Sequence, residues 1–76
     1  MAKRNQQYLT AFGNNLRRLI EESKTTPEQV AAIGNIETKQ VYRVMNGEHS
    51  TTLSIIKAIA DGLEIHPKIL FEFDFK

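Results

Sequence analysis

Helix start and stop signals lie close together between residues 26 and 47, at the spacing that two short consecutive helices require. Thr26 is a good N-cap, Pro27 suits the first helical position, and Gln29 is placed to complete a capping box. A short helix should follow. Gly34-Asn35 should end it, because Gly and Asn tolerate the left-handed conformation found at helix ends.

A second short helix is expected over Thr38–Asn46, with Val41 and Val44 facing inward and Asn46-Gly47 as its stop. Helices this short are marginal in isolation, so both must gain stability by packing on the rest of the chain. Two such helices joined through a tight turn form a helix-turn-helix signal.

Three further helical segments are expected around this pair. The first spans about residues 8–23, a longer one follows a cap at Thr51 or Thr52, and a short last turn covers residues 68–71 after Pro67. The inner faces of the first two consist of Leu9, Phe12, Leu16, Leu19 and Ile20, and of Leu53, Ile56, Ile59, Ala60 and Leu63. The pattern predicts an all-α fold of five helices. The tail from residue 71 to 75 alternates apolar and polar residues, as an extended strand does.

The length and composition of the chain exclude several classes of protein. Seventy-six residues form one small domain, and the absence of cysteine removes disulfides and thiolate metal sites. No apolar run approaches the ~20 residues that cross a bilayer. His49 and His66 have no acidic spacing around them that would make a metal site. We therefore expect a cytoplasmic protein with no metal, no cofactor and no membrane partner.

The net charge of +1 conceals an uneven distribution. Residues 1–18 and 39–60 are basic, at +4 and +2, whereas residues 19–38 and 61–76 are acidic, at −3 and −2. An anionic partner would therefore be met by one face of the molecule rather than by its overall charge.

The second helix of a helix-turn-helix unit fits the major groove of DNA, where its outward side chains meet the bases. Arg and Lys donate to guanine, Gln pairs with adenine, and a Thr methyl or a Tyr ring contacts the thymine methyl. With the two valines inward, the candidate base-reading residues are Thr38, Lys39, Tyr42 and Arg43, with Gln40 at the edge of the same face. A polar helix face with two cations is also what a plain solvated surface looks like.

Four segments together resemble a Cro/CI-type (XRE-like) helix-turn-helix domain, the lambda-repressor-like fold of phage repressors and small bacterial regulators. They are Phe12-Gly13-Asn14-Asn15-Leu16-Arg17-Arg18-Leu19-Ile20, Thr26-Pro27-Glu28-Gln29-Val30-Ala31, residues 36–47 and residues 53–71. The resemblance implies double-stranded DNA as the partner and the same base-reading positions. It also implies phosphate contacts before and after the reading helix, from Thr26, Asn46, Ser50 and Thr51.

Three positions depart from the usual pattern of that family. Pro27 stands where a Gln is common, which removes one customary phosphate contact. Asn35 replaces the Gly of the turn and should preserve it. Ile20 and Met45 stand where many members bury an Arg–Glu pair, and because both are apolar, no lone charge is buried.

The N-terminal end leaves two alternatives open. The expected division is a flexible arm over residues 1–7, a helix-turn-helix domain over residues 8–71 and a tail over residues 72–76. Lys3 and Arg4 in the arm either stay free in solvent or contact DNA phosphates.

The C-terminal end also leaves two alternatives. Its aromatic side chains either fold back to complete a small core or meet a twofold-related mate. A homodimer is expected on DNA, because two subunits read two half-sites. The candidate dimer residues are Ile65, Leu70, Phe71, Phe73 and Phe75.

The leading hypothesis is a sequence-specific double-stranded DNA-binding transcriptional regulator, more specifically a repressor, acting as a homodimer without a small-molecule effector. The alternative is a protein-interaction module of the same fold, such as an antitoxin-like partner binder. Pro27 and the low net charge favour that alternative a little. An enzyme is not expected, because Ser, His and carboxylates show no paired arrangement.

Overall fold

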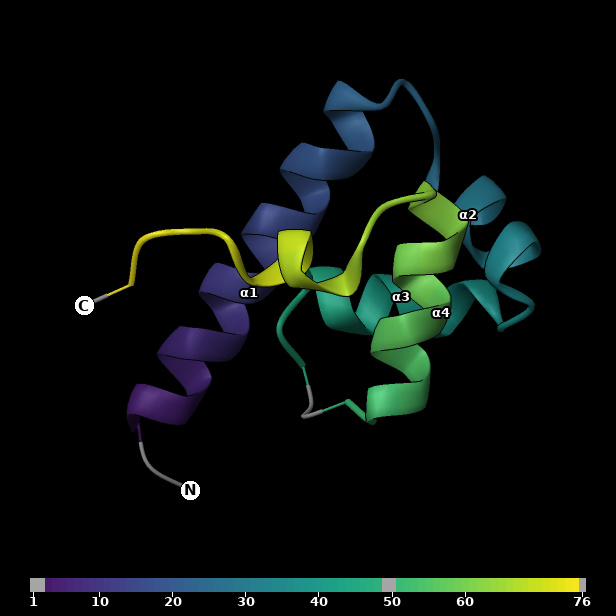
Figure 1. Ribbon diagram of the computed structural model, residues 1–76. Helices are drawn as coiled ribbons and strands as arrows, with labels where there is room; N and C mark the ends of the chain where they lie inside the picture. The colour runs from purple at the N-terminus through teal and green to yellow at the C-terminus, as the bar shows by residue number, and fades with distance from the viewer. Residues whose placement is uncertain (1–2, 49–50, 76) are drawn as a thin grey trace.

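The computed structural model describes residues 3–48 and 51–75, which form four α-helices and one 3-10 helix. In chain order these are α1 (Lys3–Glu22), α2 (Pro27–Gly34), α3 (Thr38–Met45), α4 (Leu53–Leu63) and η1 (Pro67–Phe71). Figure 1 shows α1 along one side of the molecule, α2, α3 and α4 gathered on the other, and η1 between them. The predicted all-α class is confirmed. None of the described helices is both long and apolar enough to cross a membrane.

The prediction of five α-helices is wrong in its last member, because residues 67–71 form a 3-10 helix in the part of the chain that the structure describes. The Ile69 N–H donates to the His66 carbonyl at 3.0 Å, and His66 Nδ1 accepts from the Lys68 N–H at 3.0 Å. A segment of five residues that opens on Pro67 has too little length for an α-helical ladder, and the tighter turn suits it.

Helix α1 begins at Lys3, so the expected flexible arm is not found over residues 3–7. A tertiary contact explains the early start: Gln6 Nε2 donates to the Gly47 carbonyl at 2.8 Å, at the corner that follows α3. Lys, Arg and Gln also have high helix propensity. The remainder of the predicted arm, residues 1 and 2, lies outside the described residues.

The core lies where α1 faces the other elements. Each element supplies at least one fully buried side chain, and the largest are, in chain order, Leu16, Val30, Val41, Ile59 and Leu70. Ile20 and Met45, which replace the family's buried Arg and Glu, are 3% and 6% exposed and belong to the same core. This pair therefore contributes apolar packing and buries no charge.

Two helix pairs approach one another at glycines. A Cβ atom at Gly13 in α1 would collide with the carbonyl oxygens of Val44 and Met45 in α3. A Cβ atom at Gly62 in α4 would lie 2.8 Å from Cγ1 of Val30 in α2 and would collide with the Val30 carbonyl oxygen. These crossings fix α3 against α1, and α2 against α4, nearly backbone to backbone.

The C-terminal tail folds back on α1, the first of the two alternatives for its aromatic residues (Figure 1). The Phe73 ring centroid lies 5.4 Å from that of Tyr8 and 6.2 Å from that of Phe12, and Phe75 lies 5.0 Å from Tyr8. No strand occurs among residues 3–48 and 51–75, so the predicted extended tail is not a strand. Its alternating phenylalanines instead pack on α1.

Candidate nucleic-acid interface

Helices α2 and α3 and the turn between them form the helix-turn-helix unit expected from the capping signals. The Oγ1 atom of Thr26 accepts from the Gln29 N–H at 3.1 Å, and Gln29 Oε1 accepts from the Thr26 N–H at 3.2 Å. The predicted capping box is therefore confirmed. Asn35 ends α2 in the left-handed conformation, with φ of 61°, so the turn tolerates Asn in place of Gly.

Helix α3 has a buried and an exposed face. Val41 and Val44 are 0% and 5% exposed, as their spacing predicts. The candidate base-reading residues lie on the remaining faces. Lys39, Tyr42 and Arg43 are exposed, and Thr38 and Gln40 are half-buried. The outward position of the first three is confirmed, and their role in reading bases stays a prediction.

Two of these residues are held by carboxylates of the helix-turn-helix unit itself. The Tyr42 hydroxyl donates to Glu28 Oε2 at 2.8 Å, and Lys39 Nζ lies 3.5 Å from Glu37 Oε1. The hydrogen bond to Glu28 raises the pKa of Tyr42 above its usual value, with desolvation and the charge of the same carboxylate acting in the same direction. Among the described residues no ion pair holds Arg43, so its guanidinium is open to an anion.

Sequence reasoning missed both carboxylate contacts. The approach of Glu37 to Lys39 could have been suspected from their separation of two residues. The contact between Glu28 and Tyr42 joins residues 14 apart across the turn, and it depends on how α3 is rotated against α2. No local signal indicates that rotation.

The candidate phosphate residue Asn46 forms a small polar cluster at the end of α3. Its Oδ1 accepts from Arg17 Nη2 at 3.1 Å, and its Nδ2 donates to Glu48 Oε2 at 3.4 Å. Arg17 belongs to α1 and is not among the candidate DNA-contacting residues predicted from the sequence. The fold brings its guanidinium beside the end of α3, across 29 residues of sequence.

The other candidate phosphate residues that the structure describes lie at the starts of two different helices. Thr26 is exposed at the start of α2, and Thr51 is half-buried before α4. Thr52, and not Thr51, caps α4 by accepting from the Ile55 N–H at 3.2 Å. Ser50 lies outside the described residues, as do the side chains of Lys3 and Arg4.

The candidate dimer residues divide between core and surface. Leu70 is fully buried, so its assignment to a dimer surface is wrong: Asn15 Nδ2 donates to the Leu70 carbonyl at 3.0 Å and ties η1 to α1. Phe71 is 45% exposed. The remaining three are half-buried, namely Ile65, Phe73 and Phe75.

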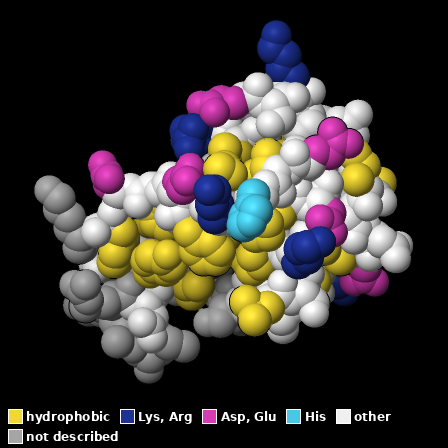
Figure 2. All heavy atoms as spheres, viewed as in Figure 1, with side chains coloured by type: hydrophobic (Ala, Val, Ile, Leu, Met, Phe, Trp, Pro, Cys, Tyr) yellow, Lys and Arg dark blue, Asp and Glu magenta, His cyan; other side chains and the backbone are white. Residues whose placement is uncertain are grey.

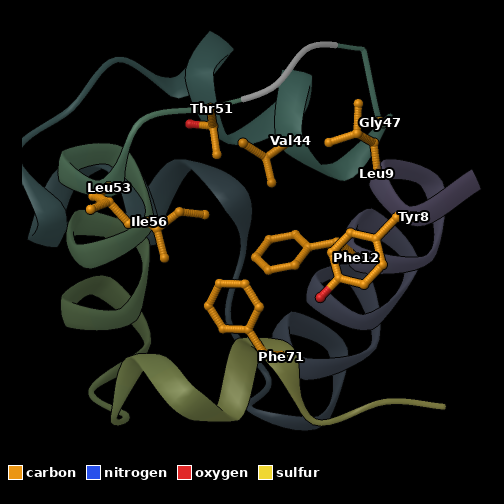
Figure 3. A pocket seen from close by; sticks show the side chains of 9 residues that line it. All are labelled: Tyr8, Leu9, Phe12, Val44, Gly47, Thr51, Leu53, Ile56 and Phe71. Atoms are coloured by element: carbon orange, nitrogen blue, oxygen red, sulfur yellow. The ribbon is translucent and has the colours of Figure 1, made fainter. Parts of the chain in front are cut away.

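Phe71 borders an apolar groove of about 210 Å³ that is lined by α1, α3, α4 and η1 and by Gly47 and Thr51 between α3 and α4 (Figure 3). The rings of Phe12 and Phe71 meet there edge to face, with centroids 5.0 Å apart and an angle of 62° between their planes. Leu53, expected on the inner face of its helix, is 84% exposed at the edge of this groove, because it occupies the first position of α4. Figure 2 shows hydrophobic side chains gathered in a band over η1 and the tail.

Comparisons with known proteins agree with this geometry. A helix-turn-helix family model matches residues 16–70, more than half of the chain. The chain is also similar to the crystal structure of the restriction-modification controller protein C.AhdI from Aeromonas hydrophila, with 29% identity and a TM-score of 0.80 over 86% of this chain and 98% of that chain. No curated protein matches the sequence. The chain therefore belongs to the XRE-type helix-turn-helix family, and it is a DNA-binding transcriptional regulator and not an enzyme.

Proposed function

We propose that this regulator is a repressor that binds a specific double-stranded operator as a homodimer and reads the major groove with α3. The observation that carries the proposal is the division of α3. Val41 and Val44 are locked into the core, while Lys39 and Arg43 stand exposed on the helix that fits the groove. The proposal includes no small-molecule effector.

Each exposed residue has a base that suits its chemistry. Lys39 and Arg43 donate to guanine, and the Tyr42 ring contacts a thymine methyl. The half-buried residues at the edge of the face, Thr38 and Gln40, read the thymine methyl and adenine respectively.

Residues on either side of α3 hold the DNA backbone and fix the register of the reading helix. The proposed phosphate set is Thr26, Asn46, Ser50, Thr51, Lys3 and Arg4. We add Arg17 to this proposed set, because its guanidinium donates to the Asn46 side chain at 3.1 Å.

Exposed apolar side chains support the homodimer. Leu53 and Phe71, 84% and 45% exposed, border the apolar groove and offer a surface that a second copy would cover. A twofold dimer then presents two α3 helices to half-sites about 34–36 Å apart. Sedimentation that finds only monomers, both free and with stoichiometric operator, would contradict this part of the proposal.

The repressor role rests on a general argument, because a dimer bound at a promoter can repress simply by occupying it. A reporter gene under the selected operator should therefore fall in expression when the protein is supplied. A rise in expression would refute repression without touching DNA binding.

Base reading is tested by titrating Lys39→Ala and Arg43→Ala against labelled operator and against random DNA. Each should weaken operator binding by roughly 1–3 kcal/mol and random-DNA binding much less. Lys68→Ala is the matched control, because it removes the same charge from η1, outside the helix-turn-helix unit. Equal losses on both DNAs would make Lys39 and Arg43 phosphate contacts instead.

A second candidate, an antitoxin-like partner binder, is favoured by a specific observation: carboxylates of the same unit already occupy Tyr42 and Lys39. Salt dependence separates the two candidates, because phosphate contacts release counterions and DNA affinity then falls steeply with added salt. Absence of binding to mixed genomic DNA at low salt would favour the partner binder.

A further inference from the structure

We propose that Glu28 is a positioning residue for sequence reading, which holds the ring of Tyr42 in one orientation before DNA arrives and thereby narrows the bases that α3 accepts. This inference rests on the proposed function of α3. It adds a residue of α2, outside the reading helix, to the determinants of specificity.

The geometry joins the two helices of the unit at their outer surface. Glu28 lies in the first turn of α2, directly after Pro27, and its Oε2 accepts from the Tyr42 hydroxyl at 2.8 Å. Among the described side chains no ion pair to Glu28 competes with this bond. The carboxylate is therefore committed to Tyr42 in the free protein.

Packing alone does not hold the Tyr42 ring. The residue is 40% exposed, whereas its neighbours Val41 and Val44 are 0% and 5% exposed. A ring anchored only at its Cβ atom samples several rotamers, whereas one tied at its hydroxyl keeps a single orientation. A fixed ring fits one arrangement of bases, and a free ring can adapt to several.

The hydrogen bond and the charge of Glu28 can be separated by substitution. Glu28→Gln keeps an acceptor for the Tyr42 hydroxyl and removes the charge. Glu28→Ala removes both, and Tyr42→Phe keeps the ring while it removes the donor. A positioning role predicts that Glu28→Ala and Tyr42→Phe behave alike, and that Glu28→Gln resembles the unsubstituted protein.

The experiment is selection of bound sites from a random double-stranded DNA library with the unsubstituted protein and these three variants. Glu28→Ala and Tyr42→Phe should each lose discrimination at the same base position, by roughly two- to tenfold, which is what one hydrogen bond contributes. The other positions should keep their preferences. Glu72→Ala is the matched control, because it removes an exposed carboxylate from the tail and should leave the selected motif unchanged.

Three outcomes would overturn the inference. Unchanged motifs in Glu28→Ala and Tyr42→Phe would show that the bond does not act in reading. Equal loss in Glu28→Gln and Glu28→Ala would assign the effect to charge and not to position. Failure of the unsubstituted protein to select any motif would refute the proposed function itself, whereas the first two outcomes leave that function standing.

A measurement on the free protein checks the bond without DNA. Because the hydrogen bond raises the pKa of Tyr42, Glu28→Ala should lower that pKa toward its usual value, and Glu28→Gln should restore part of the shift. A Tyr8→Phe background leaves Tyr42 as the one tyrosine of the 76 residues, so its ultraviolet titration is unambiguous. If the pKa of Tyr42 is the same in Glu28→Ala as in the protein that keeps Glu28, the hydrogen bond does not form in solution.

Discussion

Replacing Gly62 with Ala tests the packing of α2 against α4. Helix propensity and tertiary packing predict changes in the free energy of unfolding that have opposite signs. Within a helix, Gly is less favourable than Ala by about 1 kcal/mol, so helix propensity alone predicts that Gly62→Ala stabilises the protein. The tertiary structure predicts the reverse. Gly62 is buried where α4 crosses α2, and its α-hydrogen faces Val30, which is fully buried.

The size of the effect follows from the contacts that a new methyl group would make. It would lie 2.8 Å from Val30 Cγ1 and 2.9 Å from the Val30 carbonyl carbon, whereas ordinary contact begins at 3.4 Å. The Val30 carbonyl oxygen lies closer still, so the backbone of Val30 would have to retreat by about 1 Å, and a backbone atom cannot move aside by changing rotamer. Overpacking of this kind costs about 2–3 kcal/mol. After the propensity gain, the net loss of stability is about 1–2 kcal/mol.

Thermal and urea unfolding measure this difference directly. A loss of that size in a domain this small lowers Tm by roughly 5–15 °C. Ser54→Ala, on the exposed side of α4, is the control and should change stability by less than about 0.5 kcal/mol. A Gly62→Ala variant as stable as the unsubstituted protein, or more so, would refute the backbone-to-backbone crossing.

Three further predictions concern single contacts and are measured in the same unfolding assays. Asn15→Ala should destabilise the protein by about 2 kcal/mol, because its amide donates to the carbonyls of Ile69 and Leu70 at 3.3 and 3.0 Å; an unchanged Tm would mean that η1 is held by packing alone. Phe73→Ala should cost about 1–2 kcal/mol by removing the ring contacts to α1, unless the tail detaches freely. Thr26→Ala should cost about 1 kcal/mol through the lost N-cap, and Thr26→Ser should restore most of it.

The sequence was most informative where structure depends on local interactions. The start of α2 at Pro27 and its end before Asn35 follow from capping geometry, which involves residues only a few positions apart. The start of α1 at Lys3 does not follow from local interactions, because it depends on the contact between Gln6 and Gly47, which are 41 residues apart. The packing of Gly62 against Val30 cannot be predicted from local interactions either, because the two residues lie on different helices.

The candidate site shows the same limit. Valine spacing is enough to predict which side of α3 faces outward, since that depends on the helical period alone. What each outward side chain contacts depends on the neighbouring helix. The hydrogen bonds between Tyr42 and Glu28 and between Arg17 and Asn46 could therefore not be predicted from the sequence. These contacts also change how the net charge of +1 bears on DNA binding. Lys39 lies beside Glu37, so Arg43 is the exposed cation of α3 that no described carboxylate neutralises. Affinity for random DNA should therefore be low. Discrimination between DNA sequences should depend on the fit of α3 to its site.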